Sequence, residues 1–209
     1  MRFHYGAPPE NPDFVPEADG WRKMAFDPGP LLLQLLAIPV IALLALLWGN
    51  LFFLVLPAKF TPVQLVSSPI FSLGWLVLFT VLLIIIPVHE LLHALVHPHW
   101  GRSPNTILGA WLSKGIFYAH YEGEMPRNRF LLVYVAPYLV LGLLPLGLLA
   151  LLGGALWSPG AVVILALVSL FGSLSACGDI IGVILLLFQI PGRALVRNKG
   201  WKTYWKPIP

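Results

Sequence analysis

The residues best suited to chemistry are two histidines and a glutamate in the run Val88-His89-Glu90-Leu91-Leu92-His93. This run has the pattern H-E-x-x-H, with the histidines four positions apart. Side chains four apart lie on one face of a helix, so both imidazoles are expected to point the same way. Two neutral imidazoles can supply two ligands to a zinc ion, and Glu90 would lie beside them as the base that accepts a proton from water.

The surroundings of this motif are apolar. Residues 71–88, immediately before the motif, carry no charged side chain. Ionisable groups at membrane depth are costly and usually mark a functional site. The alternative is a pair of packed histidines with an isolated glutamate. The apolar setting favours the metal site, with His89 and His93 as ligands and Glu90 as the general base.

The composition is that of a membrane protein. Of 209 residues, 58% are hydrophobic and only 11% are charged, whereas soluble domains have about 25% charged residues. The net charge is +4, but the basic residues flank apolar segments, which is typical of membrane topology, and no nucleic acid partner is expected. The single cysteine, Cys177, excludes an internal disulfide. Residues 1–30 lack the apolar core of a cleavable signal peptide.

Four apolar segments are long enough to cross a bilayer, which takes about 20 helical residues. They lie at residues 31–56, 69–96, 130–152 and 161–190. Together they predict an all-α membrane protein with four transmembrane helices, in which residues 31–190 form one domain in the lipid bilayer.

The segment between the second and third spans is more polar. Residues 106–112 and 115–121 are rich in β-branched and aromatic side chains around a Ser-Lys-Gly turn, which predicts a short β-hairpin or amphipathic segment at about 106–121. An exposed strand edge there could pair with an extended peptide. Equally, the hairpin could plug the site or lie on the membrane surface.

The two ends of the chain are polar. Residues 1–30 contain six prolines and predict an extended, weakly ordered arm. Residues 191–209 form a basic tail. The arm, the 101–129 loop and the tail hold every lysine and arginine except Lys59, so the positive-inside rule places all three, and both termini, in the cytoplasm.

This topology supplies a candidate for the third ligand. A catalytic zinc typically has three protein ligands and one open position. The second and fourth spans both run towards the cytoplasm, and Asp179 is expected within one or two helical turns of the depth of the H-E-x-x-H motif. It is the one acidic residue in the first, third and fourth predicted spans. Asp179 is therefore the predicted third ligand, although it could instead pair with a cation or accept hydrogen bonds from nearby serines.

His97 is the rival third ligand. It lies four residues after His93 and continues the same stripe. Pro98 follows it, however, and disfavours helical geometry at the residue before a proline. His97 therefore ranks second to Asp179.

These residues resemble a known class of enzyme. His89-Glu90-Leu91-Leu92-His93 late in a span, with Gly178-Asp179 in a later one, is similar to the site-2 protease group of intramembrane zinc metalloproteases. More closely, the chain resembles a family of small, mostly bacterial membrane proteins described as putative zincin peptidases. The match covers roughly residues 70–190 and includes Ala136-Pro137 and Ser175-Ala176-Cys177-Gly178-Asp179. The residues around Asp179 differ from the Asn-Pro and Asp-Gly pattern of site-2 proteases.

The resemblance implies hydrolysis of peptide bonds in or beside the membrane. His89, His93 and Asp179 would hold one zinc ion (Zn2+), and Glu90 would be the general base. The substrate would be a membrane protein or peptide cleaved near the cytoplasmic side. The resemblance also implies location in a bacterial inner (plasma) membrane.

Two other functions remain open from the sequence. One is a catalytically silent metal-binding membrane scaffold or chaperone. The other is a transporter of metal or small solutes, which would need polar positions at several depths. Iron, cobalt or manganese could also occupy a site of two histidines and one carboxylate.

Overall fold

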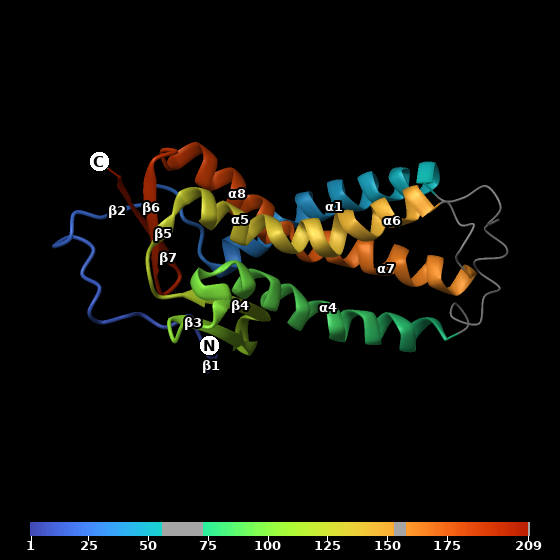
Figure 1. Cartoon of the computed structure of the whole chain (residues 1–209), viewed down its shortest axis with the longest axis horizontal. Helices are drawn as coiled ribbons and strands as arrows, with labels where there is room; N and C mark the ends of the chain where they lie inside the picture. Colours follow the sequence, from blue (N-terminus) through green and yellow to red (C-terminus); the bar gives the residue numbers. More distant parts are fainter. Residues whose placement is uncertain (56–72, 153–157, 209) are drawn as a thin grey trace. The chain divides into compact units, whose positions relative to one another are not determined.

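The computed structural model describes residues 1–55, 73–152 and 158–208 of the chain. The described part is mostly helical, with some strands (Figure 1). The end of the first predicted span and the start of the second fall outside these residues.

In the part of the chain that the structure describes, three helices are long and apolar enough to cross a membrane, which indicates a membrane protein. They are α1 (Pro30–Val55), α4 (Gly74–Val96) and the stretch Arg127–Leu151. The last of these consists of α5 (Arg127–Pro137), the π-helical η3 (Tyr138–Leu143) and α6 (Leu144–Leu152). Pro137 has no N–H to donate within a helix, and the wider π-helical turn begins directly after it.

The fourth predicted span is two helices. α7 (Pro159–Ser175) and α8 (Cys177–Gln189) meet at a 44° bend. They form a fourth span only if the two helices together cross the membrane once. At the bend, the Ser175 hydroxyl donates to the carbonyl oxygen of Gly172 over 3.0 Å. Such a back-bond from a serine to the preceding turn commonly bends a helix.

The chain divides into two compact units. Unit 1 consists of Met1–Ala37, Glu90–Ala136 and Gly178–Pro209, and unit 2 of Ile38–His89 and Pro137–Cys177. The chain passes from one unit to the other at four points. Three of these points are beside or close to a proline within a helix, and the fourth is at the bend between α7 and α8.

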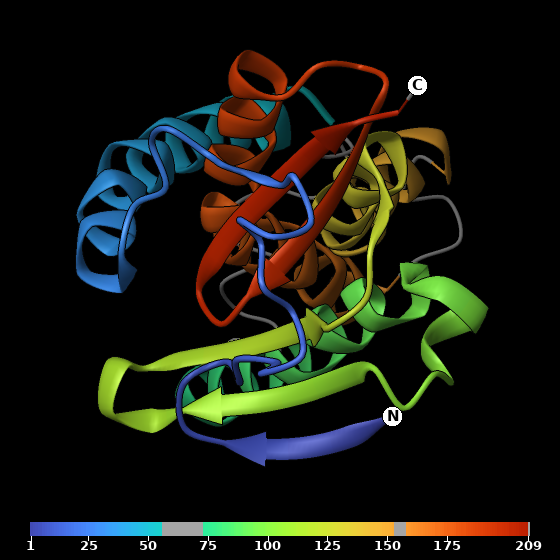
Figure 2. The same ribbon diagram turned by 90° about the vertical axis from the view of Figure 1, so that its left-hand side faces the viewer.

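Unit 1 contains two sheets (Figure 2). Sheet A has the strand order β1 (Arg2–Tyr5), β3 (Thr106–Trp111), β4 (Ile116–Tyr121). β3 and β4 are antiparallel, and β1 adds to β3 in parallel. The turn between β3 and β4 contains η2 (Leu112–Lys114) and ends at Gly115, whose left-handed φ of 64° suits a glycine.

Sheet B is antiparallel and joins both ends of the chain. Its strand order is β2 (Arg22–Lys23), β7 (Lys202–Pro207), β6 (Ala194–Lys199), β5 (Met125–Pro126). A buried apolar cluster packs α5 and α8 against this sheet and includes Met125, Val133, Leu186 and Val196. The end of α8 that follows Asp179 is thereby fixed in unit 1.

These sheets correct two expectations from the sequence. The N-terminal segment is not a weakly ordered arm, because β1 and β2 pair with distant strands and Phe14 is fully buried against Trp21 and Tyr204. The all-α class is right only for the helical majority, because the basic tail folds into the β6–β7 hairpin. Both errors concern strands whose partners lie far away in the sequence.

The N-terminal segment is also tied to the end of α8. The Gln189 side chain accepts from the N–H of Phe26 over 2.7 Å and donates to the carbonyl of the same residue over 2.9 Å. The carboxylate of Asp27 accepts from the N–H of Thr203, and burial raises the pKa of this carboxyl above its usual value. These bonds connect the start of α1, the end of α8 and sheet B within unit 1.

Unit 2 is held by a polar contact among apolar helices. The Trp48 indole N–H donates to the Ser169 hydroxyl, which donates to the carbonyl of Gly142, each over 2.7 Å. All three residues belong to different helical segments, so this chain of bonds joins α1, η3 and α7. Internal bonds of this kind satisfy polar groups that lipid cannot.

Candidate metal centre

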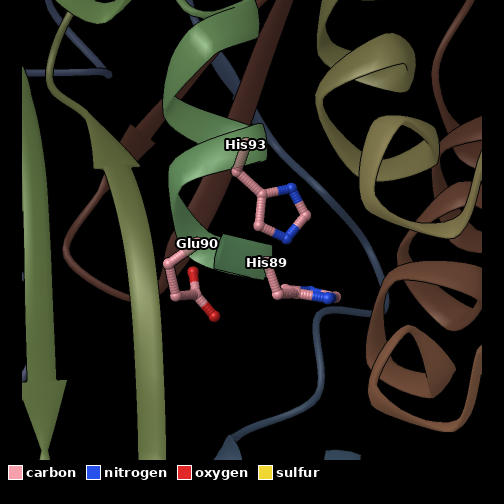
Figure 3. A group of neighbouring side chains, drawn as sticks. All are labelled: His89, Glu90 and His93. Carbon is pink, nitrogen blue, oxygen red and sulfur yellow. The ribbon is translucent and has the colours of Figure 1, made fainter. Parts of the chain in front are cut away.

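The site begins with three side chains of α4. Among the residues that the structure describes, one group of three histidine, cysteine or acidic side chains is close enough to hold an ion: His89, Glu90 and His93. Their ligand atoms lie within 4.8 Å of one another, and both histidines are buried. Figure 3 shows the two imidazoles projecting from the same side of the helix, with the Glu90 carboxylate beside His89. This arrangement follows from the helical spacing of the motif.

A backbone carbonyl fixes the orientation of His93. Nδ1 of His93 lies 2.7 Å from the carbonyl oxygen of Val133 on α5. A carbonyl can only accept, so Nδ1 carries the proton and donates it. In the neutral ring the lone pair is then on Nε2. Metal-binding histidines usually donate their other ring N–H in this way, which fixes the tautomer and the direction of the lone pair.

A hydroxyl does the same for His89. Nδ1 of His89 lies 3.1 Å from Oγ of Ser175, whose own proton is donated to the carbonyl of Gly172. The hydroxyl oxygen is therefore the acceptor, and Nδ1 of His89 is the donor. In the neutral form, both histidines of the motif thus carry the proton on Nδ1 and the lone pair on Nε2.

Asp179 lies against His93, within unit 1. Its Oδ1 is 3.3 Å from Nε2 of His93, and its side chain is only 13% exposed. A charge-assisted N–H···O bond is usually shorter, about 2.7–2.9 Å. Two ligand atoms at about 2.0 Å from a tetrahedral zinc ion are about 3.3 Å apart. Both atoms carry lone pairs when His93 is neutral, so the pair is stable only with a proton or a metal ion between them.

The donor set therefore fits a zinc ion. Two imidazole nitrogens, a nearby carboxylate and a glutamate that follows the first histidine are the chemistry of a catalytic zinc site with an open position. The structure brings His89, Glu90 and His93 together and places Asp179 beside His93. The role of Asp179 as the third ligand remains a prediction.

Sequence reasoning did not assign roles to Ser175, Tyr134 and Gly182. The Tyr134 ring lies edge-on to His93, with ring centroids 6.5 Å apart. Gly182, one turn after Asp179, lies under the same ring, because a Cβ there would be 2.9 Å from Cζ of Tyr134. Ser175 could have been suspected from its position four residues before Asp179. No sequence signal points to Tyr134.

The rival ligand, His97, belongs to a different setting. It follows α4 with extended backbone, ψ 157°, as expected before Pro98. It is not in the group of atoms close enough for one ion, and its ring lies against Tyr121. Burial lowers the pKa of His97 to about 3, with smaller contributions from the charges of His93 and His120, so the ring is neutral at physiological pH.

His120 is a second buried histidine on β4. Burial lowers its pKa to about 4, helped by the nearby charges of Arg2 and His4. Within the described ranges, its Nε2 is buried without a hydrogen-bond partner, as is Nδ1 of His97. Neither ring joins the group formed by His89, Glu90 and His93.

Comparison with known proteins agrees with this geometry. The chain matches the family model described as a putative zincin peptidase over residues 82–195, which includes the H-E-x-x-H motif and Asp179. No curated protein and no solved structure matches the chain. The family match covers more than half of the 209 residues. The chain is therefore a member of the family of putative zincin peptidases.

Proposed function

We propose that this protein is an intramembrane zinc metallopeptidase, similar to site-2 proteases, that cleaves membrane-associated proteins or peptides near the cytoplasmic side. The observation that carries the proposal is the double anchoring of the motif. Val133 and Ser175 hold the Nδ1 atoms of His93 and His89, and Nε2 of His93 faces Asp179. A pair of packed core histidines would not require both rings to be held in the same tautomer.

The chain supplies the parts that peptide hydrolysis requires. His89 and His93, with Asp179 as the proposed third ligand, would hold zinc. When bound, zinc acts as a Lewis acid that polarises a carbonyl and lowers the pKa of water. Glu90 would accept the proton of the attacking water and then donate it to the nitrogen of the leaving amine. Glu90 is less buried than the two histidines, which suits a group that must reach water.

The membrane setting supports the choice of substrate. The motif lies in the last turns of α4, a helix long and apolar enough to cross a bilayer. A site in such a helix is reached most directly by substrates that are themselves in the membrane. The cytoplasmic side follows from the distribution of lysine and arginine.

The test is cleavage by protein reconstituted in liposomes with a mixture of single-span peptides, read as new amino termini by mass spectrometry. Glu90→Gln should lower cleavage by about 10²–10⁴-fold, because it removes the base but keeps the shape of the side chain. The matched control is Glu124→Gln, at an exposed glutamate, and should cleave like the wild type.

Two results would count against the proposal. Equal cleavage by Glu90→Gln and wild type would exclude Glu90 as the base. Zinc bound by wild type without any cleavage of the peptide mixture would favour a silent metal-binding scaffold.

A further inference from the structure

One face of sheet A carries large apolar side chains that are exposed. Tyr5 is 74% exposed and Phe3 58%, and their rings contact each other edge-on. Tyr5 pairs with Ala110, which pairs with Phe117, so the three side chains lie on the same face in one row across the sheet. Phe117 is 44% exposed, and Leu112, in the turn after β3, is 67% exposed. The N-terminal strand thus extends an aromatic surface that begins on the hairpin.

The opposite face of the sheet is buried. Ile107, Tyr118 and His120 lie on the opposite face from Phe117 and are buried. The Tyr118 ring covers Gly109, its partner on β3, and its hydroxyl donates to the carbonyl of Gly6. The exposed side chains of Tyr5 and Phe117 therefore lie on the face opposite to this packed one, towards the turn, whereas Ala110 and Thr106 on their own face are buried.

A hydrogen bond sets the depth of the hairpin turn. The side-chain amide of Gln34 donates to the carbonyl oxygen of Lys114 over 2.7 Å. Gln34 lies one turn into α1, which is about 6 Å along the helix from Pro30. Because α1 is long and apolar enough to cross a membrane, the turn lies beside the first turns of a membrane helix.

We propose that the outer face of sheet A lies in the headgroup layer of the bilayer, with Tyr5, Leu112 and Phe117 in contact with lipid. Aromatic side chains concentrate at this level of a membrane, and a lysine there can extend its ammonium group to lipid phosphates. Lys114 is exposed at the same turn. The headgroup layer suits the sheet better than the hydrocarbon core, because β1 and β4 are edge strands whose outer polar groups need water or headgroups.

The other end of the hairpin is polar and provides a comparison within the same strand pair. Asn105, directly before β3, is exposed, and the amino terminus of Met1 donates to the carbonyl of Ser103 nearby. β3 rises about 3.3 Å per residue, so its six residues separate the two ends by roughly 20 Å. Asn105 therefore lies roughly 20 Å along the strand from the turn that Gln34 ties to α1.

Site-directed spin labelling of the full chain in liposomes tests this proposal. In a Cys177→Ala background, nitroxides are attached at Leu112→Cys and Tyr5→Cys, and at Asn105→Cys as the control. Phe117→Cys is a second position on the same face. Relaxation by oxygen, which concentrates in the membrane, is compared with relaxation by a water-soluble nickel complex.

The proposal predicts a ratio of oxygen to nickel accessibility several-fold higher at Leu112 and Tyr5 than at Asn105. The Phe117 label should give a similarly high ratio. Equal ratios at all positions would overturn the proposal and would leave this face for a peptide or a soluble partner. The measurement needs neither metal nor cleavage, so its outcome is independent of the proposed peptidase activity.

Discussion

At the residue scale, the two histidines of the motif are oriented by acceptors of different kinds. His93 donates to the backbone carbonyl of Val133, which no side-chain substitution removes directly. His89 donates to the hydroxyl of Ser175, which a single substitution removes. The difference makes it possible to test the orientation of one ring without changing a ligand.

Ser175→Ala should weaken metal binding about 10–100-fold, because such outer partners hold the ring and its tautomer. The ligands themselves are unchanged, so the protein should still bind metal at saturation. The measurement is competition with a zinc chelator in detergent solution.

The control is Ser173→Ala, two residues earlier in α7. The Ser173 hydroxyl is buried and has no hydrogen-bond partner among the residues that the structure describes, so its loss should leave the affinity unchanged. If Ser175→Ala and Ser173→Ala bound zinc equally well, the hydroxyl of Ser175 would have no part in holding His89.

The sequence predicts the candidate catalytic and metal-binding residues better than the groups that hold them in place. H-E-x-x-H fixes the relation of His89, Glu90 and His93 because all three lie on one helix. The juxtaposition of Asp179 and His93 follows from matched depth in two spans, and the structure gives 3.3 Å between them. Every residue has a backbone carbonyl, so the sequence could not show that the carbonyl of Val133 is the one that accepts from His93.

At the element scale, a glycine on α8 allows that helix to lie close to α5. Gly182 faces the Tyr134 ring, which in turn lies edge-on to His93. Asp179 is three residues before Gly182 and so lies on nearly the same face of α8. Because His93 is held by the carbonyl of Val133 on α5, the spacing between α8 and α5 is expected to affect the distance between Asp179 and His93.

Gly182→Ala should loosen the metal site, because the new Cβ would lie 2.9 Å from Cζ of Tyr134 and would push the helices apart. We expect weaker zinc retention and an altered visible spectrum of the cobalt-substituted protein, which reports ligand geometry. Gly147→Ala is the matched control, since a Cβ there would meet no atom within 4 Å.

A smaller ring partner should rescue the variant. Combining Gly182→Ala with Tyr134→Leu relieves the contact and should restore part of the zinc retention. A cobalt spectrum identical in Gly182→Ala and wild type would show that this contact does not position Asp179.

The elements themselves were predictable to different degrees. Continuous apolar runs predict the start of α1 and the end of α4 close to where the structure has them. The bend between α7 and α8 was missed, because the back-bond of Ser175 to Gly172 cannot be told from hydropathy. β1 and β2 were missed because proline-rich composition carries no information about partners at the other end of the chain.

At the scale of the whole molecule, the sheets constrain the topology. β1 pairs with β3, β2 with β7 and β5 with β6, so the N-terminal segment, the 101–129 loop and the tail must lie on one side of any membrane. An even number of crossings must then separate these segments. This favours treating the bent pair of α7 and α8 as a single span that returns the chain to that side. The cytoplasm as that side remains a prediction from the positive-inside rule.

The central claim is that the chain holds one metal ion through His89, His93 and Asp179, and the measurement that tests it most directly is the metal content of the purified protein. The comparison includes wild type, Glu90→Gln, His93→Ala and Asp179→Ala. We predict about one zinc per chain in wild type and Glu90→Gln, and loss or strong weakening in the other two, because a ligand is removed only there. Absence of metal from wild type purified without chelators, or equal zinc in all four proteins, would contradict the account.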